Sequence, residues 1–226
     1  MVTGASRGIG AAIAEALAGE GARVVRLARS LGRGGQGGRG GPVVDYRCDV
    51  TDADRVAAVR DGVLAEVGVP DILVNNAGTF LLKPFAETTP AEFRGQLEVN
   101  VTGVFLVARA FIPAMGERGR GDVVTVGSVS DHVAYAGNAA YGASKWAARG
   151  LHEVLAAELA DSALRLTLVS PGPTNTDLWD PVAPDTRDDV PDRATMLRPR
   201  DVAEAVRWVV TRPVGVSVPL LRIMPR

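Results

Sequence analysis

Short apolar runs alternate with longer amphipathic stretches along most of the chain. Apolar positions that recur every three or four residues predict helices, whereas short apolar runs bounded by glycine or polar residues predict buried strands. On this basis we expect strands at residues 24–28, 43–46, 72–74, 123–126, 164–169 and 216–223. We expect helices at residues 9–19, 51–67, 92–115, 139–159 and 202–210. Thr51 is the expected N-cap of the second helix.

Strands that alternate with helices of this length are typical of a parallel sheet with helices on both faces. We therefore predict one α/β domain over residues 1–226, built on a doubly wound sheet. Ligands of such sheets bind beyond the carboxyl ends of the strands, so the loops that follow the strands are the place to look for chemistry.

Two segments depart from the alternation. Residues 31–41 contain seven glycines where a crossover helix would be expected, and because glycine disfavours helix we predict a flexible loop. Residues 174–200 are rich in proline and aspartate and predict a long surface loop. Residues 173–198 would form a substrate loop or lid.

The composition of the chain argues against several kinds of partner and site. The 226 residues carry 25 basic and 26 acidic side chains, a balance that gives no sign of a nucleic-acid partner. The longest apolar stretch, residues 104–115, is too short for a membrane span, and no apolar leader opens the sequence, so we expect a cytoplasmic protein. The single Cys48 excludes an internal disulfide, and with only His132 and His152 beside it we expect no metal site.

The segment at residues 3–10, Thr-Gly-Ala-Ser-Arg-Gly-Ile-Gly, opens the first predicted helix. Glycines there let the chain turn sharply and let a pyrophosphate approach the helix N-terminus, where free amides and the helix dipole favour anions. A glycine turn before a helix can equally be structural, so the loop alone does not decide between the two. The candidate cofactor-binding residues in it are Gly4, Ser6, Arg7, Gly8, Ile9 and Gly10.

The second predicted strand ends in Ala28 and Arg29. Sheets that bind NAD place an acid near this point to hold the ribose 2′-hydroxyl, whereas a guanidinium fork suits a 2′-phosphate. Arg29, with Arg7 from the glycine loop, therefore predicts NADP(H) rather than NAD(H). Two surface arginines in an arginine-rich chain are the alternative interpretation.

Tyr141 and Lys145 lie four residues apart on a predicted helix and therefore share one face. An ammonium beside a phenol lowers the pKa of the tyrosine and makes it a usable proton donor or acceptor near neutral pH. Ser128 follows a strand end, where its hydroxyl can reach a bound substrate. The nearby Asp131 and His132 also allow a hydrolase triad, but no G-x-S-x-G elbow accompanies them.

Taken together, these segments resemble the motifs of the short-chain dehydrogenase/reductase family almost from end to end. The glycine loop is similar to the T-G-x-x-x-G-x-G of that family, and Tyr141 and Lys145 form its Y-x-x-x-K, with Ser128 thirteen residues earlier. The resemblance implies a Rossmann-like fold whose first strand is truncated here, since only Met1 and Val2 precede the loop. The other similar segments are Asp49-Val50, Asn75-Asn76-Ala77-Gly78, Asn100, and Ser170-Pro171-Gly172 followed by Thr174 and Thr176.

The resemblance implies hydride transfer between NADP(H) and a carbonyl or secondary alcohol of a small or medium organic substrate. Ser128 would bind the carbonyl oxygen and Tyr141 would move the proton, while Lys145 would lower the tyrosine pKa and hold the nicotinamide ribose. Asn100 would order a water of the proton relay. The remaining cofactor-binding residues implied are Arg29, Asp49, Val50, Asn76, Ala77, Gly78, Pro171, Gly172, Thr174 and Thr176, together with Tyr141 and Lys145.

Two alternative functions stay open. One is a sensor that binds NADP(H) without catalysis. The other, within the family, is a 3-oxoacyl-carrier-protein reductase, although residues 216–226 lack the V-D-G-G ending common among those enzymes. The resemblance further implies a homodimer or homotetramer formed through the helices at residues 92–115 and 139–159.

Overall fold

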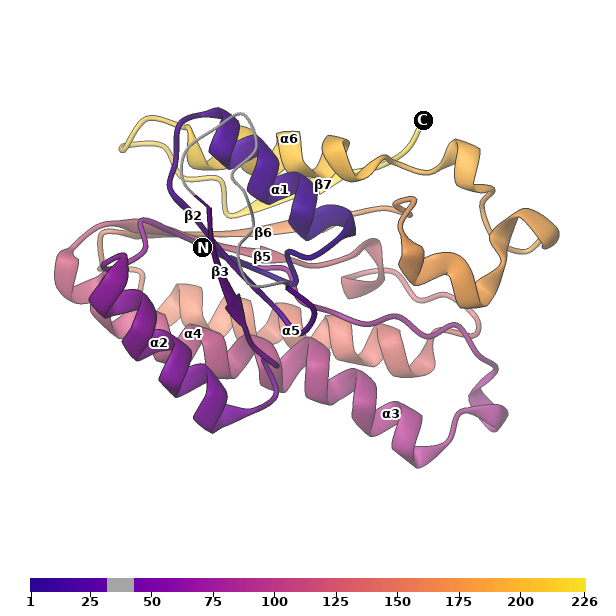
Figure 1. The fold of residues 1–226 in the computed structure, drawn as a ribbon. Coiled ribbons are helices and arrows are strands. Elements are labelled where there is room, and N and C mark those ends of the chain that lie inside the picture. The colour runs from indigo at the N-terminus through magenta and orange to yellow at the C-terminus, as the bar shows by residue number, and fades with distance from the viewer. Residues whose placement is uncertain (32–42) are drawn as a thin grey trace.

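A seven-stranded parallel sheet forms the centre of the protein in the computed structural model, which describes residues 1–31 and 43–226 (Figure 1). The strand order β3-β2-β1-β4-β5-β6-β7 reverses direction at β1, so the predicted doubly wound, Rossmann-like sheet is confirmed. The strands are β1 (Val2–Thr3), β2 (Val24–Ala28), β3 (Val43–Arg47), β4 (Ile72–Asn75), β5 (Gly121–Val126), β6 (Leu164–Pro171) and β7 (Leu220–Ile223).

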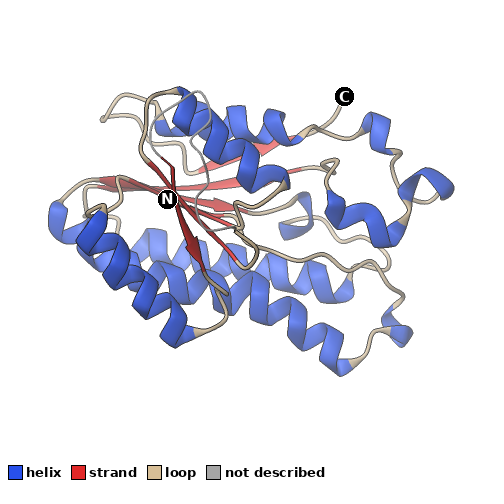
Figure 2. Ribbon diagram, viewed as in Figure 1, coloured by secondary structure: helices blue, strands red, loops and turns tan. Residues whose placement is uncertain are grey.

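Helices cover both faces of the sheet, as Figure 2 shows. On one face Ile13 and Val206 are fully buried against Val2, and on the other Phe111 is fully buried against Leu73. Each such side chain contributes about 1.5–3 kcal/mol through burial. The first face carries α1 (Gly8–Gly19) and α6 (Pro199–Val210), and the second carries α2 (Ala53–Glu66), α4 (Gly103–Arg118) and α5 (Ala139–Glu158), with α3 (Pro90–Leu97) packed on α5.

The predicted helix at residues 92–115 differs from the structure in length and in regularity. It runs from Pro90 to Arg118, and residues Glu98–Thr102 between α3 and α4 form a π-helical turn. Such a turn inserts an extra residue into the hydrogen-bond ladder and has no signature in the apolar periodicity. The continuous helix is long and apolar enough to cross a membrane by length and composition, but its buried side chains pack in the core beside the sheet.

Two other boundaries differ from the prediction, and one predicted segment is not described by the structure. The N-cap of α2 is Asp52 and not Thr51, whose amide and hydroxyl both donate to Asp49 instead. The last strand covers only Leu220–Ile223, a shorter span than residues 216–223. The glycine-rich loop predicted at residues 31–41 lies, apart from residue 31, outside the described residues.

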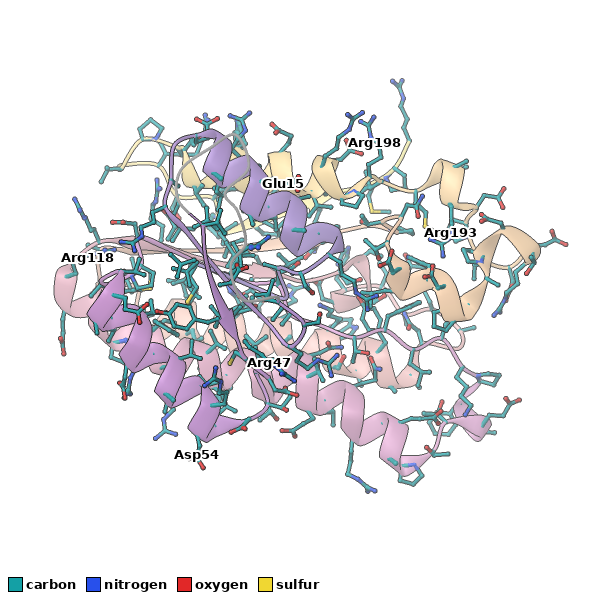
Figure 3. The ribbon with its side chains drawn as sticks, in the orientation of Figure 1. Glu15, Arg47, Asp54, Arg118, Arg193 and Arg198 are labelled. Carbon is teal, nitrogen blue, oxygen red and sulfur yellow. The ribbon has the colours of Figure 1, made fainter. Side chains whose placement is uncertain are left out.

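The segment predicted as a lid is a chain of short 3-10 turns at Asp177–Val182, Pro184–Thr186 and Arg193–Thr195, and α6 already begins at Pro199. Arg193 holds these turns together: its guanidinium donates to the side chains of Asn175 and Asp180 at 2.9 and 2.6 Å (Figure 3). The aspartates of this segment are therefore in part ion-paired within it rather than simply hydrated.

We predict that Asp52→Ala destabilises the fold. The Asp52 carboxylate accepts a hydrogen bond of 2.9 Å from the Arg55 amide at the start of α2, and removal of such a cap costs about 1 kcal/mol. Urea unfolding measures the effect. Asp61→Ala, an exposed change in the middle of the same helix, is the control and is expected to cost less than about 0.5 kcal/mol. Equal destabilisation by both changes would contradict the assignment.

Candidate active site

A cavity of about 1120 Å³ opens beyond the carboxyl ends of the strands. Every residue predicted to bind the cofactor lines it, and so do three of the four predicted catalytic residues. The fourth, Asn100, lies fully buried beneath the loop that follows β4. The predicted residues that line the cavity are Gly4, Ser6, Arg7, Gly8, Ile9, Gly10, Arg29, Asp49, Val50, Asn76, Ala77, Gly78, Ser128, Tyr141, Lys145, Pro171, Gly172, Thr174 and Thr176.

The glycine loop is tightly folded at the N-terminus of α1. Gly4 and Gly8 adopt left-handed φ angles of 65° and 57°, which favour glycine. A side chain at Gly10 would collide with the Gly4 carbonyl oxygen and with the Asn76 amide. The loop thus leaves its backbone amides at the helix N-terminus uncovered by side chains, an arrangement that fits a phosphate group.

The two arginines predicted to meet a 2′-phosphate differ in their surroundings. Arg29 is exposed at the end of β2, lines the cavity and lies close enough to Asp49 to contribute to the lowering of its pKa. Arg7 instead reaches across to the lid, where it donates to Asp177 at 3.2 Å with both side chains more than half exposed. Arg29 is therefore the better placed of the two for an anion at the end of β2.

Asp49 lies at the edge of the cavity after β3. Its carboxylate accepts hydrogen bonds from the amide and the hydroxyl of Thr51, at 3.1 and 2.8 Å. These bonds stabilise the ionised form and hold the pKa of Asp49 below its usual value. A fixed acceptor at this edge suits the adenine-side role that the sequence motif implies.

Ser128, Tyr141 and Lys145 meet at the end of β5. The Ser128 hydroxyl accepts a hydrogen bond of 3.2 Å from the Ser130 amide, which orients it. Lys145 is buried, donates to the Val126 carbonyl at 3.1 Å, and places its ammonium 5.7 Å from the centre of the Tyr141 ring. The three side chains that the sequence selected are therefore brought together at one point of the cavity.

The expected lowering of the tyrosine pKa by Lys145 is not found in this structure. Burial raises the pKa of Tyr141 to about 12, the Ser128 hydroxyl acts in the opposite direction, and Asp131 raises it further. Burial also lowers the pKa of Lys145 to about 8, because an ammonium is disfavoured away from water. Burial is thus the largest cause of both pKa shifts.

Asn100 sits in the π-helical turn and fastens the loop after β4. Its carbonyl oxygen accepts from the Thr79 amide at 2.8 Å, and its amide nitrogen donates to the Thr79 carbonyl at 3.0 Å and to the Ser144 hydroxyl at 2.9 Å. The side chain thus connects this loop to α5, one residue from Lys145. This observed role is structural and adds to the water-ordering role that the resemblance implies.

The substrate side of the cavity is aromatic. Phe80 lies edge-on to Tyr141 with ring centres 4.9 Å apart, and Trp179 of the lid lies 4.8 Å from Phe80. The loop after β4, which carries Phe80, and the lid, which carries Trp179, therefore meet beside the Tyr141 ring. Phe80, Tyr141 and Trp179 all line the cavity and give this part of it an aromatic wall.

The hydrolase triad is not assembled among the described residues. His132 Nδ1 lies 2.7 Å from Asp131, but no hydrogen bond joins the imidazole to Ser128 or Ser130. The Asp131 carboxylate instead contacts the Ser128 amide and the Ser170 hydroxyl. Sequence reasoning missed this arrangement, because Ser170 lies 39 residues further along the chain.

The doubly wound sheet, the glycine loop and the Ser–Tyr–Lys group define a dinucleotide-binding oxidoreductase of the α/β class. Residues 1–187 match the family described as short chain dehydrogenase, and the chain belongs to that family. Its members bind a nicotinamide cofactor and act on small molecules.

Two curated relatives illustrate the family. The chain is 40% identical over 194 residues to D-threitol dehydrogenase of Mycolicibacterium smegmatis, a match that covers 80% of this chain and 73% of that protein. It is 35% identical over 197 residues to the 3-oxoacyl-[acyl-carrier-protein] reductase FabG of Escherichia coli, a match that covers 83% of this chain and 78% of that protein.

A third relative is much longer. The whole chain matches 18% of the glycine betaine reductase ATRR of Emericella nidulans, at 35% identity.

Among solved structures, a metagenomic short-chain oxidoreductase in complex with NADP is similar over 100% of this chain and 95% of its own. The TM-score is 0.81 and the sequence identity 34%. The similarity therefore extends over both chains almost completely.

We predict that Gly10→Ala disrupts the glycine loop. Its new methyl group would meet the Gly4 carbonyl and the Asn76 side chain, at a cost of about 1–3 kcal/mol in unfolding free energy. Dinucleotide binding, measured by titration calorimetry, is expected to weaken at least about tenfold because the amides shift. Gly19→Ala, at the other end of α1 with open space around it, should be neutral or stabilising. Wild-type binding by Gly10→Ala would exclude the proposed cradle.

Proposed function

We propose that this protein transfers a hydride between NADP(H) and a carbonyl or secondary alcohol of a small or medium organic molecule. The observation that carries the proposal is the convergence of Ser128, Tyr141 and Lys145 with the glycine loop on one cavity. Family membership supports it, since short-chain dehydrogenases use a nicotinamide cofactor.

In the direction of reduction, the nicotinamide when bound supplies the hydride and the chain supplies the proton and the orientation. Ser128 donates a hydrogen bond to the carbonyl oxygen, and Tyr141 donates its proton to the same oxygen. A tyrosine pKa of about 12 keeps the phenol protonated at neutral pH, as a donor requires. Lys145 holds the ribose hydroxyls and stabilises the phenolate left behind. Asn100 steadies the loop beneath which a proton-relay water would lie.

NADP(H) is the proposed cofactor rather than NAD(H). Arg29 lines the cavity at the end of β2, and neither Ala28 nor Ser30 beside it is an acid that would repel a 2′-phosphate. Asp49 would accept a hydrogen bond on the adenine side of the cofactor, and the segment that begins at Pro171 would lie along the nicotinamide. The NADP complex of the similar metagenomic oxidoreductase agrees with this choice.

The lid at residues 173–198 is proposed to close over the substrate. Trp179 already contacts Phe80, and Arg7 ties the lid to the glycine loop through Asp177. The apolar, aromatic wall favours an organic carbonyl over a highly charged substrate. The relatives include both a polyol dehydrogenase and an acyl-carrier-protein reductase, so an acyl-carrier substrate is the second candidate within the family.

We also propose that the protein self-associates through α4 and α5, as a homodimer or homotetramer. Phe105 on α4 and Trp146 and Val154 on α5 are 45, 52 and 55% exposed, which is unusual for large apolar side chains on two neighbouring helices. Sedimentation velocity of the purified chain tests the oligomeric state.

Tyr141→Phe is expected to lower turnover at least about 100-fold, because the proton donor is removed while the ring remains. The measurement is steady-state NADPH consumption with a panel of ketones and aldehydes. Tyr46→Phe is the control, since its hydroxyl bonds Glu66 away from the cavity, and it should keep full activity. Tight NADPH binding by the wild type with no turnover across the panel would favour a sensor instead.

Arg29→Asp is expected to raise the KM for NADPH about 10- to 100-fold, because a charge-assisted contact with the 2′-phosphate is replaced by repulsion. The same change should improve the use of NADH. Arg23→Asp, an exposed change of the same type just before β2, serves as the control. An unaltered ratio of NADPH to NADH efficiency in Arg29→Asp would exclude this arginine as the source of cofactor preference.

A further inference from the structure

Asp131 is a fully buried carboxylate directly behind the catalytic serine. One of its oxygens, Oδ2, accepts hydrogen bonds from the Ser128 amide at 3.1 Å and from the Ser170 hydroxyl at 2.5 Å. The other oxygen lies 2.7 Å from Nδ1 of His132, whose ring is partly exposed. The carboxylate thus links the serine segment, the strand end that leads into Pro171, and a side chain that reaches solvent.

The Asp131 carboxylate is surrounded by hydrogen-bonding groups. The Ser128 amide and the Ser170 hydroxyl both donate to Oδ2, and Nδ1 of His132 lies beside Oδ1. Gly127 makes the space: a Cβ at that position would collide with Oδ2 of Asp131. A buried charge is costly unless it is hydrogen-bonded and compensated, so its position beside the Tyr141–Lys145 pair calls for an explanation.

We propose that Asp131 is a positioning residue for hydride transfer: its carboxylate orients Ser128 through the main chain and compensates the buried ammonium of Lys145. This inference rests on the proposed function, because it assigns Asp131 a role in that reaction. Asp131 does not line the cavity and so acts through Ser128 and Lys145 rather than on the substrate.

The turn that carries Asp131 packs against α5 and β6. From α5 the titratable or charged groups are Tyr141, Lys145 and Arg149, and the Asp131 charge acts to raise the pKa of each. The largest influence is burial for Tyr141 and Lys145, and the hydrogen bond to Glu153 for Arg149. From β6 the group that contacts the Asp131 carboxylate is the uncharged Ser170 hydroxyl. His132, the next residue along the chain, contacts it from the end of the same turn.

The decisive group is Lys145. Its buried ammonium donates to the Val126 carbonyl, and the buried Asp131 carboxylate accepts from the Ser128 amide two residues further along the same segment. Burial lowers the pKa of Lys145 to about 8, and among the described residues the Asp131 carboxylate works against this shift. Without the carboxylate the pKa of the ammonium would fall further, and Lys145 would lose its proton at a lower pH. A neutral amine would then no longer stabilise the phenolate or favour the dinucleotide phosphates.

The test is the titration of Lys145 in Asp131→Asn. The chain has two lysines, so carbon-13 labelling at lysine Cε gives two resonances, which Lys83→Arg assigns. Asparagine keeps an acceptor for Ser128 and Ser170 and can donate to His132, so the main loss is the charge. We expect the Lys145 midpoint to fall by about one pH unit and that of Lys83 to stay, as a charge at short range in protein predicts.

Asp61→Asn is the matched control, an exposed change of the same type on α2, and should leave both midpoints in place. Should Asp131→Asn fold poorly, Asp131→Ser removes the same charge and should shift Lys145 in the same direction. An unchanged titration midpoint of Lys145 in a folded Asp131 variant would overturn the inference. A merely structural role would lower stability without this selective shift.

Activity separates this inference from the proposed function. In the reductive reaction with NADPH, the alkaline limb of the kcat/KM profile should move to lower pH in Asp131→Asn, in step with the Lys145 titration. Wild-type turnover with an unmoved Lys145 midpoint refutes the role of Asp131 and leaves the proposed function standing. Absence of wild-type turnover with a shifted midpoint refutes the proposed function while the charge coupling holds.

Discussion

The hydrogen bonds between Thr3 and Asn76 hold together the carboxyl ends of β1 and β4, and the cavity edge depends on them. The Thr3 hydroxyl donates to the Val74 carbonyl and accepts from the amides of Asn76 and Ala77, at 3.3, 2.9 and 3.0 Å. The Asn76 side chain returns to the Thr3 carbonyl at 2.9 Å. Because β1 has only two residues, these bonds extend a short ladder to the point where the glycine loop begins. The glycine loop after β1 is therefore bonded at its base to the cavity-lining loop after β4.

At this edge, burial is the main influence on the pKa values of the proposed catalytic groups. Away from water the phenol of Tyr141 keeps its proton and the ammonium of Lys145 tends to lose its own, so the pKa values move to about 12 and about 8. The first shift suits a proton donor. The second shift brings the pKa of Lys145 close to neutral pH, so the buried carboxylate of Asp131, which acts to raise that pKa, matters for the charge of the lysine. Burial of the Asp131 carboxylate alone or of the Lys145 ammonium alone would be costly in free energy, and burial of the two charges together costs less.

Much of this site follows from local sequence patterns. The glycine loop at residues 3–10 and the strand ends are short-range features, and parallel strands bring the loops after them to one edge, so the selected residues line one cavity. Contacts between residues far apart in the sequence leave no such local pattern, so the hydrogen bond from the Ser170 hydroxyl to Asp131 could not be predicted from the sequence. The N-cap of α2 shows a second limit of prediction from the sequence, at the level of a single residue. Thr51 and Asp52 are both good N-caps, and only the competing bond from Thr51 to the loop carboxylate decides for the aspartate.

The two lysines of an otherwise arginine-rich chain illustrate how burial selects side chains. Lys83 forms a partly exposed ion pair with Glu92, whose carboxylate also caps α3, and so anchors the loop after β4 to that helix. Lys145, in a buried site, donates among the described residues to one acceptor, the Val126 carbonyl. A guanidinium there would bring five donors and a charge that cannot be relieved by loss of a proton. A compact ammonium can be satisfied by one carbonyl and a nearby carboxylate, with donors left to face a bound ribose and the phenol.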